Sequence, residues 1–185
     1  MRRRIPMKDT TRVSLALFAA WAVHDAEELV TMSRNSRRVL ARLPRWMPIP
    51  DDLRARGLSQ AHVDLSLALM AASIAAASML GVRSGGRSVL FRGALLAFGA
   101  HGFTHLAGSV VTRGYTTGVL TAPTVVIPYW LWARRVLRRN DIRDDDGPAS
   151  AAAVANLALL FGIHAVARLI LGSRSLGPEP AASDE

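Results

Sequence analysis

The chain has 185 residues, a length that allows one domain, and 50% of them are hydrophobic. It contains no cysteine, which excludes disulfides and thiolate metal sites, so any metal must be held by imidazole, carboxylate or water. The formal net charge is +9, but most basic residues lie between apolar stretches, where anionic lipid headgroups are their natural partner. No basic surface with interleaved aromatic residues is evident, so we do not expect nucleic-acid binding.

Five apolar stretches follow one another, each close to the length needed to cross about 30 Å of hydrocarbon. They cover residues 13–30, 63–82, 89–111, 117–136 and 151–171. The sequence therefore predicts an all-α integral membrane bundle of about five transmembrane helices in a single membrane domain, residues 1–185. Within it we expect a basic N-terminus (1–12), the helical bundle (13–172) and a disordered tail of Gly, Pro, Ala and acidic residues (173–185).

The first stretch follows a basic N-terminus and could be a signal peptide, with Ala20-Trp21-Ala22 as a cleavage site. Because the apolar run continues past Ala22 and four more stretches follow, we expect an uncleaved first helix. The long connection 33–62 contains three prolines, so no long helix is expected to cross it. Pro123 and Pro128 are expected to kink the fourth helix.

Basic residues also predict orientation. With a cytoplasmic N-terminus, 13 Lys and Arg residues lie inside and 9 outside, a small preference for this arrangement. Lys8 is the only lysine, and this bias toward arginine, together with abundant alanine, indicates a bacterial genome of high GC content. We therefore expect a multi-pass protein of a bacterial cell membrane. The sequence does not indicate an oligomeric state.

Ionisable residues interrupt the first and third apolar stretches at helical spacing. They are His24, Glu27 and Glu28 in the first and His101 and His105 in the third. An ionisable side chain at the centre of a membrane helix costs roughly 2.5–3.5 kcal/mol on insertion scales, so a cluster needs a partner, a proton or a metal. Spacings of three and four residues put each group on one helix face.

The positions of these residues predict that they meet. The first, third and fifth helices run in the same direction if all five cross the membrane. His24, His101, His105 and His164 then all lie roughly 17–24 Å from the same face, at 1.5 Å per residue. We expect His24, Glu27, Glu28 and His105 to form one cluster with His101 at its edge, and the fifth helix to bring its polar residues to the same place. His62 is assigned to the loop before the second helix.

Four kinds of site are compatible with these residues. His24 with Glu27 or Glu28, together with His101 and His105, is a three- or four-ligand set suited to zinc or iron. Without a metal, Glu27, Glu28, His24 and His105 could act as catalytic acids and bases on a hydrophobic small molecule. The same residues could form an ion or proton pathway, or only hold helices together. The structural interpretation is favoured for His164, with Arg168 reaching the interface, and for Thr117, Thr121 and Thr124 on the fourth helix.

The enzyme interpretation is preferred over a transporter because the polar residues concentrate at one level and no internal repeat is visible. The cofactor is not identified by the sequence, with zinc or iron the candidates. The partners expected are the lipid bilayer and a hydrophobic small-molecule substrate.

The motif His24-Asp25-Ala26-Glu27-Glu28 resembles the one that names the HXXEE-domain membrane proteins. A second stretch also resembles that family: His105-Leu106, Ser109, Arg113-Gly114-Tyr115-Thr116-Thr117-Gly118 and Thr121-Ala122. Thr117 stands where the family usually has proline. The resemblance covers residues 13–136 and implies a small polytopic bacterial membrane protein with the HxxEE acids and His105 as its signature site. It implies no activity, because the family is largely uncharacterised.

Overall fold

The computed structural model describes residues 8–178, and in this range the chain is all-helical, with one isolated β-bridge between Leu58 and Leu176. The α-helices are α1 (Asp9–Arg42), α2 (Asp51–Arg56), α3 (Gln60–Arg83), α4 (Val89–Thr112), α5 (Ile127–Arg139) and α6 (Gly147–Leu171). A π-helical turn, η1 (Ala122–Val126), precedes α5, and a 3₁₀ turn, η2 (Gly172–Ser175), follows α6.

The first helix is longer than predicted. We expected it to end near residue 30, yet α1 runs without interruption for 34 residues to Arg42. The charged residues after Ser33 do not end a helix, because arginine is a good helix former. The helix stops immediately before the first proline: Leu43, which precedes Pro44, has an extended backbone (φ −66°, ψ 146°), as residues before proline do.

Three helical segments are long and apolar enough to cross a membrane: α3, α4 and residues 147–175. The prediction of about five such helices is thus confirmed only for the second, third and fifth stretches. The first and fourth stretches did not form helices of this kind. α1 carries the ionisable cluster within its apolar part, and α5 has 13 residues, a length of about 20 Å. On α6, Val154, Phe161 and Leu169 are 69%, 67% and 83% exposed, a surface compatible with hydrocarbon rather than water.

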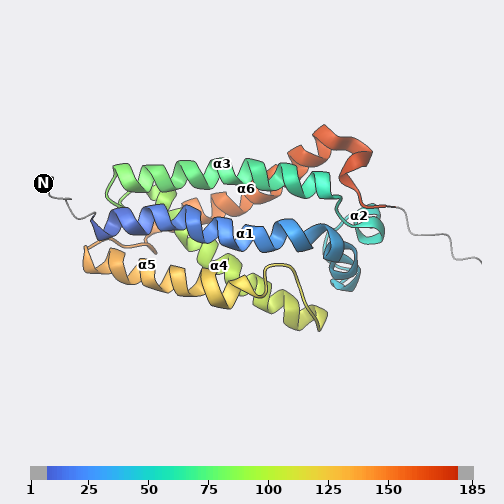
Figure 1. Cartoon of the computed structure of the whole chain (residues 1–185), viewed down its shortest axis with the longest axis horizontal. Helices are drawn as coiled ribbons and strands as arrows, with labels where there is room; N and C mark the ends of the chain where they lie inside the picture. The colour runs from blue at the N-terminus through green and yellow to red at the C-terminus, as the bar shows by residue number, and fades with distance from the viewer. Residues whose placement is uncertain (1–7, 179–185) are drawn as a thin grey trace, which may run out of the picture.

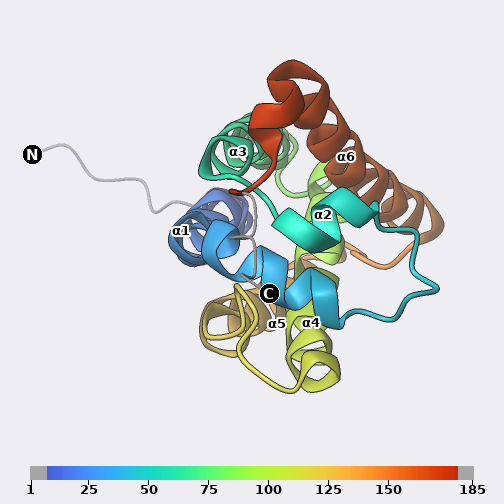
Figure 2. The same ribbon diagram turned by 90° about the vertical axis from the view of Figure 1, so that its right-hand side faces the viewer.

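The five long helices lie side by side with alternating directions (Figure 1). The colour gradient shows α1, α4 and α6 running one way and α3 and α5 the other. The most extensive contacts are between α1 and α3 and between α4 and α6. The view along the bundle places α3 and α6 at the top, α1 at the left and α5 at the bottom, with the near end of α4 beside α5 (Figure 2).

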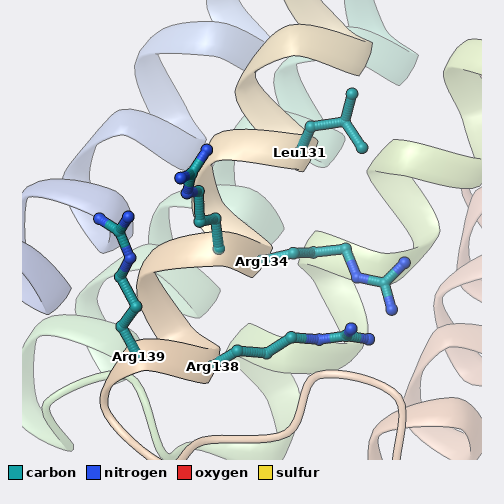
Figure 3. A pocket seen from close by; sticks show the side chains of 5 residues that line it. Leu131, Arg134, Arg138 and Arg139 are labelled. Carbon is teal, nitrogen blue, oxygen red and sulfur yellow. The ribbon is translucent and has the colours of Figure 1, made fainter.

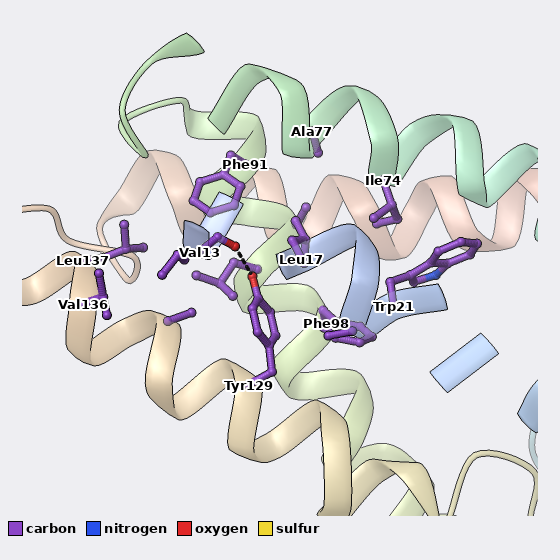
Figure 4. Packing of buried hydrophobic residues seen from close by; sticks show 14 of the residues in the cluster. Val13, Leu17, Trp21, Ile74, Ala77, Phe91, Phe98, Tyr129, Val136 and Leu137 are labelled. Atoms are coloured by element: carbon purple, nitrogen blue, oxygen red, sulfur yellow. Dashed lines mark hydrogen bonds between the residues drawn. The ribbon is translucent and has the colours of Figure 1, made fainter. Parts of the chain in front are cut away.

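The apolar core fills one half of this bundle (Figure 4). Val13 and Leu17 of α1 and Phe91 of α4 are completely buried there, against residues of α3 and α5. The buried hydroxyl of Tyr129 donates to the carbonyl of Val13 over 2.9 Å. The core ends at the same level on both helices, at Trp21 of α1 and Phe98 of α4. The next turn of each helix is polar, so this level is where the candidate site begins.

The C-terminal end of α6 is tied to the segment before α3. The amide of Ser59 donates to the carbonyl of Ser175 over 3.0 Å, and Arg56 donates to the carbonyl of Gly177 over 2.8 Å. Within the predicted disordered tail (173–185), residues 173–178 include the end of η2 and make these contacts. The rest of the predicted tail (179–185) and the first seven residues of the basic N-terminus lie outside the described range.

Candidate metal centre

Four side chains from two helices converge on one point next to the apolar core. His24 and Glu28 lie four residues apart on α1, and His101 and His105 four apart on α4, so each pair shares one helix face. One ligand atom from each of the four lies within 4.8 Å of all the others. The predicted meeting of the first and third helices is therefore found. His101, expected at the edge, belongs to the group as fully as His105 does.

The distances within the group lie on both sides of the ligand spacing around a small metal ion. The Nε2 atom of His105 lies 3.2 Å from Nε2 of His24 and 2.8 Å from Nε2 of His101. Oε1 of Glu28 lies 3.3 Å from Nε2 of His105 and 3.8 Å from those of His24 and His101. Ligands at 2.0–2.1 Å from a tetrahedral zinc would lie about 3.3–3.4 Å apart. The four donor atoms therefore fit a metal of this size without large movements.

The imidazole rings stand edge to face around the shared point. The ring planes of His24 and His101 are 88° apart, and those of His101 and His105 are 80° apart. The side chain of His24 is fully buried, and Glu28 and His105 are 7% and 11% exposed. His101 is 32% exposed and shares its side of α4 with the exposed Thr104. The site is thus open at His101 and closed around the other three ligands.

The connection between α4 and α5 covers the site from the side opposite the core. Gly118, with φ +78°, lies against two ligand rings: a Cβ atom there would be 2.7 Å from Cε1 of His105 and 2.8 Å from Cε1 of His24. The hydroxyl of Thr116 donates to the carbonyl of His105 over 3.2 Å. Glycine at position 118 therefore lets the backbone approach both rings.

Glu27 lies outside the four-ligand group, although the sequence placed it among the candidate ligands. Its carboxylate accepts hydrogen bonds from the hydroxyl of Tyr115 (2.6 Å) and from the amide (2.9 Å) and hydroxyl (2.6 Å) of Thr121. The same hydroxyl oxygen is 2.7 Å from Nδ1 of His24. Sequence reasoning assigned Thr121 to helix packing and gave Tyr115 no role. Their place in the second stretch of the family resemblance was the signal that could have identified them.

His164 does not join the cluster. Its Nδ1 lies 2.9 Å from Nε2 of His62, which is buried in the first turn of α3, and 3.4 Å from the hydroxyl of Ser66. The predictions that the fifth helix would contribute to the cluster and that His62 belongs to a loop were therefore wrong. The reason is the packing of α6, whose early residue Ala152 touches Gly93 of α4 whereas its later part reaches α3.

Arg168, one turn after His164, is also held within the protein, by an ion pair with Asp52 of α2. From the sequence we expected the side chain of Arg168 to reach the membrane interface, and the ion pair with Asp52 was not predicted. The two imidazoles and this ion pair form a second polar region near the end of the bundle that carries α2.

A surface hollow on α5 does not belong to the site (Figure 3). It is lined by Leu131 and four arginines, Arg134, Arg135, Arg138 and Arg139. Arg134 and Arg138 form ion pairs with Asp144 and Asp145. The hollow contains no metal-ligating side chain, and Arg134 lies 13 residues, about 20 Å along a helix, from Thr121 at the candidate site.

Comparison with known proteins gives one match. A family model described as "Protein of unknown function with HXXEE motif" matches residues 15–133. No curated protein and no solved structure gives a significant match to the chain. The matched range includes all four candidate ligands, Glu27 and the α4–α5 connection, and it ends before α6.

Proposed function

We propose that this chain, which belongs to the HXXEE family of proteins of unknown function, is a metal-dependent enzyme of a bacterial cell membrane that acts on a hydrophobic small molecule. The observation that carries the proposal is the convergence of ligand atoms from three histidines and one glutamate within 4.8 Å of one another, close enough to share a metal ion. Membrane insertion is supported by three apolar helices of sufficient length, and bacterial origin by the composition.

The donor set favours zinc or iron. Imidazole and carboxylate suit both ions, and the chain has no cysteine to select a softer one. A bound ion of this kind would supply Lewis-acid polarisation or an activated water. His24, Glu28, His101 and His105 would hold it, and the α4–α5 connection would exclude water from the side of Gly118.

The substrate class follows from where the site is open. The exposed edge of the ligand group is His101, and it lies on α4, one of the three apolar helices. Thr104, three residues further on and about 60° around the helix from His101, is also exposed. In a membrane this face of α4 would meet acyl chains, so a molecule dissolved in the bilayer could approach the ligands without crossing water.

Proton- or ion-coupled transport is the second candidate. The observation that favours it is a second polar group at another level of the bundle, formed by the buried His62 and Ser66 and the partly buried His164. Transport requires polar groups at several depths of the membrane. These residues form such a group at a level where the sequence had indicated none.

Elemental analysis of the purified protein tests the metal proposal. We expect about one zinc or iron per chain in the wild type, lost in His105→Ala and Glu28→Gln, because each variant removes one donor of the group. His62→Ala is the matched control, since it removes a buried histidine outside the cluster and should keep the metal. A folded wild type that binds neither ion when supplied with both would overturn the metal proposal and move weight to metal-free acid–base chemistry.

A further inference from the structure

The two adjacent glutamates of the motif have different surroundings. Successive residues of an α-helix point about 100° apart, so Glu27 and Glu28 cannot both face the ligand group. Glu28 turns its Oε1 to the three imidazoles, whereas Glu27 turns to the α4–α5 connection. There it meets the hydroxyl of Tyr115 and both the amide and the hydroxyl of Thr121.

The hydrogen bonds of Thr121 determine where its hydroxyl proton points. Both of the hydroxyl's other neighbours are acceptors: the carboxylate of Glu27 at 2.6 Å and the carbonyl of Gly118 at 3.4 Å. The single proton of the hydroxyl is therefore directed away from His24, toward the nearer acceptor, Glu27. The oxygen of Thr121 is left to accept a hydrogen bond from Nδ1 of His24, 2.7 Å away.

This arrangement selects one tautomer of His24. A neutral imidazole carries one proton, and here it lies on Nδ1. The Nε2 atom then presents its lone pair to the point shared with Glu28 and His105, the form in which histidine binds a metal.

We propose that Glu27 is a positioning residue that acts through Thr121 to hold His24 in its metal-binding tautomer and orientation. This inference rests on the proposed metal centre. The four donors from Tyr115, Leu120 and Thr121 hold the carboxylate of Glu27 in place, and the same contacts fasten the α4–α5 connection over the site. The motif thus contains one glutamate that binds the metal and one that orients a ligand.

Substitutions at Thr121 test the inference with little change of volume. Thr121→Val removes the acceptor for Nδ1 of His24 and keeps the side-chain shape. Thr121→Ser keeps the hydroxyl and is the matched control. We expect Thr121→Val to weaken metal binding by about 10- to 100-fold, as loss of a partner that orients a ligand does, and Thr121→Ser to stay close to the wild type. Glu27→Gln should also weaken binding, because its amide group brings a donor to a site already filled with donors.

Two measurements read the effect independently of activity. Competition with a chromophoric chelator gives the affinity for zinc, and the visible absorption of the cobalt-loaded protein reports the geometry of the ligands. Thermal unfolding of the metal-free proteins shows whether the variants are folded. If the wild type binds metal and Thr121→Val binds it with unchanged affinity and an unchanged cobalt spectrum, the inference is wrong and the metal centre stands. If the wild type binds no metal, both proposals are overturned.

Discussion

At the scale of single residues, the packing around the cluster is tightest at Gly118. Its backbone has a positive φ, and the position of a Cβ atom is already occupied by the rings of His24 and His105. These rings cannot move aside freely, because His24 is hydrogen-bonded to Thr121 and His105 lies beside Glu28. Any side chain at position 118 would therefore disturb two ligands together.

We predict that Gly118→Ala destabilises the protein and disorders the proposed metal centre. Gly85→Ala is a control for the backbone alone, because Gly85 also has a positive φ (+60°) but a Cβ atom there would have no neighbour within 4 Å. Alanine is strained at a positive φ, which should lower the free energy of unfolding by about 1–2 kcal/mol in both variants. Gly118→Ala should lose roughly a further 1–3 kcal/mol from steric overlap. Equal unfolding free energies for the two variants in detergent would contradict the clash described for position 118.

At the scale of helices, α4 and α6 are joined at their beginnings by a charged contact. Arg92 of α4 donates to the carboxylate of Asp146 (2.5 Å) and to the carbonyl of Arg143 (2.6 Å). Asp146 is also the N-cap of α6 and accepts from the amide of Ala149 over 2.9 Å. These contacts align α4, which carries two ligands, with α6.

This contact predicts a dependence of stability on pH. The hydrogen bond from Arg92 holds the pKa of Asp146 below its ordinary value of 3.8. A lowered pKa in the folded state means that the contribution is complete above the ordinary pKa and is lost as the pH falls through the folded value. Asp146→Asn keeps an N-cap and removes the charge. We expect the stability difference between wild type and variant, measured by thermal unfolding, to be constant well above pH 3.8 and to shrink over the acid range below it, as the pH falls toward the lowered pKa of the folded state. A difference that stays constant over this range would contradict the charged contact.

At the scale of the whole molecule, the helix directions determine on which sides of a membrane the chain ends lie. The beginning of α1 and the end of η2 are at opposite ends of the bundle (Figure 1). Arginines occur at both ends: α5 finishes with Arg138 and Arg139 at the end where α1 begins, and the last turns of α1, with Arg38 and Arg42, lie at the other end (Figure 1). Both groups are placed to meet lipid headgroups if the bundle crosses a bilayer.

We predict that reporters fused to the two ends of the chain will lie on opposite sides of the membrane, with the N-terminal reporter in the cytoplasm. An odd number of crossings requires this separation, and the count of basic residues predicts the orientation. Reporters accessible from the same side would rule out any odd number of crossings, three and five included. Opposite sides with an external N-terminus would keep an odd number of crossings and reverse only the orientation.

Much of the local structure was predictable from the chain. The stretches 63–82 and 89–111 became α3 (Gln60–Arg83) and α4 (Val89–Thr112), because apolar runs of this length have few alternatives to a helix. The pairing of His24 with Glu28 and of His101 with His105 also followed from helical spacing alone. Such features depend on residues within one or two turns of each other, so the sequence expresses them directly.

The tertiary structure decided which of these local features meet. It selected Glu28 over Glu27 as the companion of the three histidines, placed Thr121 on His24 across 97 residues of chain, and paired His164 with His62 across 102. It also brought Arg38 and Arg42, in the last turns of α1, against the carbonyls of Tyr115 and Thr112, at the α4–α5 connection and the end of α4. These outcomes depend on how far each helix is rotated and tilted against its neighbours, and that is set by packing of the whole bundle rather than by the spacing of residues along one helix.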